Sequence, residues 1–173
     1  MRNLVYIFII YFMILPISTF AVPKSIELYI EKPKIVGSGR LSFWMWDVYD
    51  ASLYAEDGMY KNSKPFALYI KYLMSFRKES LANRTIQEIK RQGYKDNDKL
   101  LLWKNQLIKI FPDVEKGEAI TAIYLDGGSI GFFLENKSLG YINSPEFTRK
   151  FFDIWIGEKT SEQELRIKLL NLN

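Results

Sequence analysis

Arg40 and Tyr49 are the two residues whose types and spacing best suit the binding of an anion. They lie in an aromatic run that is rich in strand-forming residues, where Trp44 and Met45 are predicted to form the two-residue turn of a hairpin. Arg40 would then lie directly opposite Tyr49 on one face of the strand pair. A guanidinium beside a phenol can hold a carboxylate or phenolate, because both groups donate hydrogen bonds and the guanidinium carries a fixed charge.

A plainer interpretation of the same residues is also open. Arg40 could be a surface arginine that pairs with Asp47 or Asp50, while Tyr49 packs in the core. The two hypotheses differ in whether the guanidinium reaches a cavity.

Composition removes several kinds of chemistry. The chain has 173 residues without a cysteine or a histidine, which excludes disulfides, thiolate metal sites and catalysis by imidazole or by Ser-His and Cys-His pairs. We expect no metal and no cofactor. The 24 basic and 20 acidic residues give a net charge of +4, and they alternate without a basic run. This distribution favours a solvated surface, so no nucleic-acid partner is expected.

The N-terminal segment has the pattern of a signal peptide. Arg2 precedes an unbroken apolar stretch at residues 4–15, and a small-residue cleavage site follows at Thr19-Phe20-Ala21. Pro16 ends the stretch, which is short for a bilayer span of about 20 residues. We therefore expect residues 1–21 to be removed and the protein to be exported, either periplasmic or secreted. Residues 22–173 are predicted to form a single domain without an integral membrane segment.

Hydrophobic periodicity predicts the elements that position these residues. Strands are expected at residues 26–30, 41–43, 46–55, 66–73, 119–125, 129–135 and 139–142. Helices are expected after an N-cap at Ser80, from about Asn97, at Pro145–Ile156 after an N-cap at Ser144, and after a capping box opened by Ser161, with Leu165, Leu169 and Leu172 facing inward. Strands first, helices in the middle, a meander and closing helices indicate an α+β fold with a largely antiparallel sheet and helices packed on one face.

The order of short motifs resembles that of the chalcone isomerase-like family. The set begins with Gly37-Ser38-Gly39-Arg40 and the Val48-Tyr49 and Leu53-Tyr54 pairs of the returning strand, and it closes with Ile154-Trp155-Ile156-Gly157. The similarity extends over about residues 34–170. It implies an open-faced β-sandwich, in which a long curved sheet packs helices on one side and the ligand cleft lies between them.

The resemblance also implies roles for particular residues. In plant chalcone isomerases the arginine that matches Arg40 helps to hold the substrate oxyanion, and in fatty-acid-binding members arginine and tyrosine in this region hold the lipid carboxylate. Ligand contacts are thus implied for Arg40 and Tyr49, and for the polar Asn83 and Gln87, near which the enzymes have a later tyrosine and asparagine. The threonine that the enzymes use on the returning strand has no counterpart, so no catalytic residue is assigned.

Together these observations predict an exported domain that binds a small amphipathic, anionic ligand such as a fatty acid without turning it over. Two other functions fit the sequence. One is an intramolecular lyase or isomerase that acts on a chalcone-like or enone substrate. The other is a periplasmic interaction module whose cleft is filled by its own side chains. An open apolar cavity with the Arg40 guanidinium at its mouth or floor would favour ligand binding.

Overall fold

The computed structural model describes residues 22–172, so the predicted signal peptide at residues 1–21 lies outside the described residues. In chain order the elements are α1 (Lys24–Glu27), β1 (Pro33–Phe43), β2 (Trp46–Glu56), β3 (Phe66–Tyr72), α2 (Lys78–Arg91), α3 (Asn97–Ile110), β4 (Ala119–Tyr124), the 3-10 turn η1 (Asp126–Gly128), β5 (Ile130–Leu134), β6 (Lys137–Ile142), α4 (Pro145–Ile156) and α5 (Gln163–Leu170). Within residues 22–172, none of these helices has the length and apolar character needed to span a membrane.

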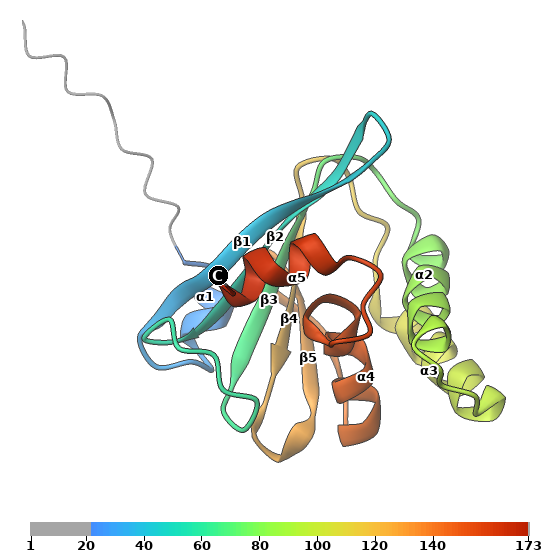
Figure 1. The fold of residues 1–173 in the computed structure, drawn as a ribbon. Helices are drawn as coiled ribbons and strands as arrows, with labels where there is room; N and C mark the ends of the chain where they lie inside the picture. The colour runs from blue at the N-terminus through green and yellow to red at the C-terminus, as the bar shows by residue number, and fades with distance from the viewer. Residues whose placement is uncertain (1–21, 173) are drawn as a thin grey trace, which may run out of the picture.

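The strands form one antiparallel sheet, and its order follows the sequence from β1 to β6. Figure 1 shows α2, α3, α4 and α5 on one side of this sheet, with the long β1–β2 hairpin projecting past the other elements. This arrangement is α+β and open-faced, which confirms the predicted fold class.

Alternation along the strands divides the buried residues between the two faces of the sheet. Leu53 and Leu68 face the helices and belong to the main core, whereas their neighbours Tyr54 and Ala67 point to the opposite face and pack in a smaller cluster with α1. Successive side chains of a strand point to opposite faces, so a single strand serves both clusters. The sheet therefore separates a large helix-covered core from a small one.

Residues 26–30 form the end of α1 (Lys24–Glu27) and the turn that follows it, and not the predicted half-buried strand. Ile26 and Ile30 are buried, but Leu28 is 76% exposed, so the alternation that suggested a strand is not the pattern of burial. A spacing of four residues between apolar side chains fits a helical turn as well as a strand. Burial of Ile26 and Ile30 against the sheet stabilises the helical turn in place of a strand.

The predicted N-cap residue is confirmed for α4 but is wrong for α2. Ser144 caps α4 as predicted, because its hydroxyl accepts a hydrogen bond of 3.2 Å from the backbone N–H of Phe147. Ser80 does not cap α2, which begins two residues earlier, at Lys78. The carboxylate of Asp113, from the segment after α3, accepts the backbone N–H of Lys78 at 2.9 Å. A residue distant in sequence therefore satisfies this helix end.

The closing helix also departs from the local prediction. The hydroxyl of Ser161 donates to Glu88 and to Glu162, and α5 begins at Gln163, so the predicted capping box is not formed. Leu165 and Leu169 are buried as predicted, whereas Leu172 is exposed.

Two glycines allow α5 to lie directly on β1. A Cβ atom at Gly37 would come within 2.0 Å of the Lys168 carbonyl oxygen, and one at Gly39 would come within 2.8 Å of a methyl carbon of Leu165. A side chain at either position would force the helix away from the strand. The Gly-x-Gly segment thus positions α5 by permitting close approach.

Candidate ligand-binding cavity

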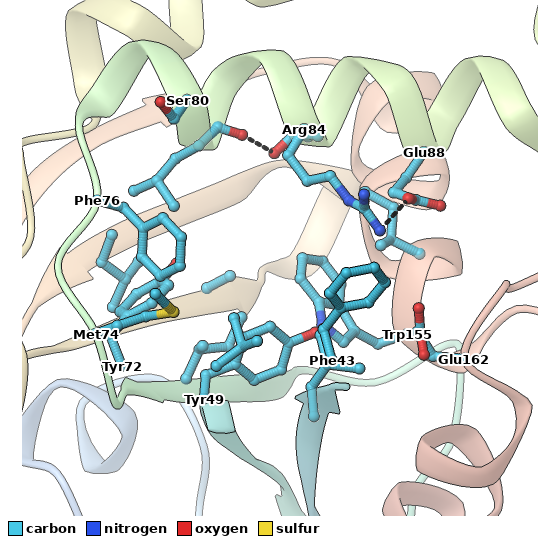
Figure 2. Close-up of a pocket in the computed structure, with 18 of the residues that line it drawn as sticks. Phe43, Tyr49, Tyr72, Met74, Phe76, Ser80, Arg84, Glu88, Trp155 and Glu162 are labelled. Atoms are coloured by element: carbon cyan, nitrogen blue, oxygen red, sulfur yellow. Dashed lines mark hydrogen bonds and ion pairs between the residues drawn. The ribbon is translucent and has the colours of Figure 1, made fainter. Parts of the chain in front are cut away.

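A cavity of about 460 Å³ lies between the helix-covered face of the sheet and helices α2 and α4. Its volume falls in the range of about 300–1,000 Å³ that is typical of small-molecule sites. Figure 2 shows side chains from the strands on one side and from the helices on the other. Its walls are mainly apolar and are lined by Leu41, Phe43, Val48, Ile70, Tyr72, Met74, Phe76, Leu81, Phe111, Ile120, Ala122, Phe151, Ile154 and Trp155.

Tyr49 supplies a polar group in this wall. Trp155 Nε1, on α4, donates a hydrogen bond of 2.8 Å to the Tyr49 hydroxyl on β2, and this contact joins sheet to helix. Burial raises the pKa of Tyr49 well above its ordinary value, so the phenol is neutral at physiological pH. The hydroxyl accepts from Trp155 and keeps its own proton, which no described residue accepts. Tyr49 can therefore donate a hydrogen bond to a ligand in the cavity.

An ion pair on α2 lines the same cavity. Glu88 is 4% exposed, and Arg84 Nη2 lies 2.7 Å from its Oε1, although the angle is not that of a hydrogen bond. The other carboxylate oxygen accepts a hydrogen bond of 3.2 Å from the Ser161 hydroxyl. Arg84 and Glu88 are labelled in Figure 2, where their side chains meet beside the cavity. Glu162 also lines the cavity. Arg91, which does not line it, lies 3.6 Å from the same Glu88 oxygen as Arg84, so Glu88 is shared between two guanidinium groups.

Arg40 does not face Tyr49, contrary to the prediction. The turn at Trp44 and Met45 is where it was expected, but the pairing shifts by one residue between Leu41 and Ser42. This shift is a β-bulge. On its side away from the turn, Leu41 pairs with Tyr49 and Arg40 pairs with Asp50. An extra residue in one strand changes the partner of every later residue, and adjacent residues point to opposite faces.

The Arg40 guanidinium is held on the surface of the hairpin. Its Nε donates to Asp50 at 2.6 Å, and its Nη1 donates to Asp47 at 2.7 Å. Half of the Arg40 side chain is exposed, and Arg40 does not line the cavity. The structure thus agrees with the plainer interpretation for the arginine, while Tyr49 is in the cavity wall.

Asn83 and Gln87 are exposed on α2 and do not line the cavity. The lining residues of this helix are Ser80, Leu81, Arg84, Thr85 and Glu88. Spacings of three and four residues put these side chains on one face, and the two predicted residues lie beside that face. The sequence identified the helix but not its inward side. The apolar Leu81 and the i,i+4 pair of Arg84 and Glu88 are the signals that could have indicated it.

Comparison with known proteins identifies a family and a similar fold. The sequence model of a family described as chalcone isomerase-like matches residues 16–171. No curated protein matches the chain. Among solved structures, a fatty-acid binding protein of Arabidopsis thaliana is similar, with a TM-score of 0.65 and 18% identity over 82% of this chain and 88% of that chain. At this identity the likeness shows the fold.

Proposed function

The chain belongs to the chalcone isomerase-like family, and we propose that its cavity binds one small amphipathic molecule, such as a fatty acid, without turning it over. The observation that carries this proposal is the cavity of about 460 Å³, which has apolar walls and one polar end. Because side chains leave this space open, the structure speaks against an interaction module with a filled cleft. The fatty-acid binding named for the similar Arabidopsis protein supports the choice of ligand.

The apolar part of the ligand lies between the sheet and the helices. Ile70 and Ile120 on the strands and Phe151 on α4 offer it a continuous apolar surface. Each Å² of apolar surface that leaves water contributes about 25 cal/mol, so the tail supplies most of the binding free energy. This part of the proposal needs no charged residue.

The head group of the ligand lies beside the Tyr49 hydroxyl, near the mouth of the cavity, which Arg84 lines. Tyr49 offers a hydrogen-bond proton to a carboxylate or carbonyl oxygen. Arg84 lines the cavity and is more than half exposed, but Glu88 lies against its guanidinium. That carboxylate offsets much of the attraction that Arg84 exerts on an anion. We therefore infer that the hydrogen bond from Tyr49 orients the head, and that an acid is preferred only modestly over its ester.

Absence of turnover is part of the proposal. Arg40, which the family resemblance pointed to as an oxyanion-binding group, is outside the cavity and pairs with two carboxylates. A developing negative charge needs donors aimed at the reacting atom, and Arg40 is not aimed there. Export, which the sequence of residues 1–21 predicts, would make the protein a periplasmic or secreted binding protein.

Titration with a ligand and its uncharged analogue tests this function. Palmitic acid and methyl palmitate are each titrated into the delipidated chain from Val22 and into Tyr49→Phe, Ala122→Phe and Tyr54→Phe. Loss of the Tyr49 hydrogen bond should weaken binding of both probes by about two- to tenfold. Ala122→Phe should abolish binding, because the added ring occupies the cavity that Ala122 lines.

Tyr54→Phe is the matched control, since Tyr54 is on the same strand but packs on the other face of the sheet. Its affinity should equal that of the unmodified chain. Thermal melting checks that Ala122→Phe remains folded, because overpacking costs about 1–3 kcal/mol. The proposal fails if neither probe binds, or if a folded Ala122→Phe binds as well as the unmodified chain.

A further inference from the structure

The tip of the β1–β2 hairpin exposes four consecutive apolar side chains. Phe43 is 70% exposed, Trp44 89%, Met45 91% and Trp46 68%, and these four residues are called the hairpin tip below. In Figure 1 the turn between β1 and β2 projects beyond the other elements of the fold. Soluble proteins rarely expose contiguous apolar surface without a use for it, because such a patch promotes association.

The backbone conformation at Trp44, in the hairpin tip, is unfavourable for a tryptophan. Trp44 has a φ of 56°, in the left-handed region. Glycine, asparagine or aspartate suits this conformation in a tight hairpin, whereas a bulky side chain is strained there. Trp44 gains no burial in return, since it is almost fully exposed. Strain that packing does not compensate suggests a function for the side chain itself.

We propose that the hairpin tip inserts into the interfacial layer of a lipid bilayer. Tryptophan favours this layer because its ring is largely apolar and its N–H can stay hydrated. A protein partner is less suited to this shape: a stable interface buries about 800 Å² on each side and seats aromatic anchors in pockets, whereas the tip is a narrow, convex projection. A bilayer accepts a convex apolar projection without a matching pocket.

The charges behind the tip favour a neutral lipid surface. Asp47 and Asp50 are the carboxylates nearest to it in sequence, and both bind the Arg40 guanidinium. With one arginine against two aspartates, the hairpin arm carries no excess of positive charge. Docking through the tip should therefore occur on zwitterionic lipid and should resist salt, unlike binding by surface lysines, which salt screens.

Continuity with the cavity gives this docking a consequence. Phe43, which belongs to the hairpin tip, also lines the cavity. Met74, which is partly exposed, lies outside the tip and lines the cavity as well. Apolar surface thus extends from the tip to the cavity mouth, and insertion brings that mouth to the lipid surface. An amphipathic ligand could then pass between bilayer and cavity without crossing water. This consequence rests on the proposed function, whereas the docking itself does not.

Vesicle flotation tests the docking. The chain from Val22, which contains all of both core clusters, is mixed with phosphatidylcholine vesicles at low and high salt. It is compared with a variant that combines Trp44→Ser, Met45→Ser and Trp46→Ser. The control combines Leu101→Ser and Leu102→Ser, since these residues of α3 are 58% and 55% exposed. We expect the tip variant to lose at least tenfold in vesicle partitioning, and the α3 variant to behave like the unmodified chain at both salt concentrations.

Brominated phosphatidylcholine provides a second measurement on the unmodified chain. Trp103 is 2% and Trp155 8% exposed, so quenching of tryptophan fluorescence by bromine reports Trp44 and Trp46. Strong quenching is expected. The proposal is overturned if vesicles bind neither chain, if binding requires anionic lipid and disappears in salt, or if the tip variant binds undiminished. A dimer in solution that the tip variant abolishes would also overturn it, because a second copy would then cover the tip.

Palmitic acid titration of the same variants separates the two proposals. The tip variant should bind the fatty acid from water as the unmodified chain does, because the three substituted residues do not line the cavity. Vesicle binding without fatty-acid binding in the unmodified chain would refute the proposed function and leave the docking intact.

Discussion

Replacing Tyr49 by phenylalanine should destabilise the fold through a residue on another element. The Tyr49 hydroxyl accepts the indole N–H of Trp155 at 2.8 Å, across the boundary between β2 and α4. Phenylalanine keeps the ring and its packing against Tyr72, whose ring centroid is 6.3 Å away. The substitution thus removes one acceptor and little apolar contact.

The expected loss follows from the burial of the donor. Trp155 is 8% exposed, so its N–H has little access to water once the hydroxyl is gone. A buried donor without a partner costs about 1–3 kcal/mol. In a domain of about 150 residues, each kcal/mol lowers Tm by about 2–4 °C. The Tyr49→Phe variant should therefore lose about 1–3 kcal/mol and melt several degrees lower.

Urea unfolding followed by circular dichroism measures this loss in a double-mutant cycle of Tyr49→Phe and Trp155→Phe. The second substitution removes the donor, so the hydroxyl has no bond left to lose in its presence. A coupling free energy of about 1 kcal/mol is expected between residues in contact. Tyr54→Phe, on the opposite face of β2, is the control for deleting a hydroxyl from this strand. A coupling near zero, or equal losses for Tyr49→Phe and Tyr54→Phe, would refute the hydrogen bond as a structural link.

Three further predictions address the site and its titration. Arg40→Ala should leave the affinity for palmitic acid unchanged, because Arg40 does not line the cavity. A marked loss of affinity in the titration would show that Arg40 contacts the ligand. The purified protein should not cyclise a chalcone above the spontaneous rate in an absorbance assay, and turnover would favour the isomerase alternative. Burial raises the pKa of Tyr60 to about 12 and those of Tyr49 and Tyr72 further. Since an unfolded tyrosine ionises near pH 10, the stability from these neutral phenols is full below about pH 10 and falls as the pH rises above it. Urea midpoints at pH 8 and pH 11 should show this fall, with tyrosinate absorbance rising together with unfolding.

Local patterns predicted most of the fold. The strand-forming runs of β2 and β3 and the apolar stripe of α4 depend on residues within one or two turns of each other, so the sequence alone placed these elements. Ser144 and Pro145 marked the start of α4 for the same reason, since a cap bonds within its own first turn. The α+β class and the helix-covered sheet follow from the order of these elements.

The candidate site was predicted less well, because it depends on which side each element presents. Tyr49 was predicted to contact a ligand, and the structure places it in the cavity wall. Asn83 and Gln87 lie on a helix that borders the cavity, yet Arg84 and Glu88, one residue further along, are the ones that line it. One residue is about 100° of rotation on a helix, and only packing against the sheet fixes that angle.

By itself the sequence determined the type of every strand and helix after the first, their order, and the absence of the cysteine and histidine side chains that many catalytic and metal sites use. Tertiary structure decided the rest. A bulge of one residue at Val48, opposite Leu41 and Ser42, turned Arg40 away from Tyr49 and toward Asp50. Packing against the sheet made residues 24–27 a helix, and Asp113 capped α2 from a distant segment. These outcomes depend on contacts between residues far apart in the chain, whose free energies no short window of sequence contains.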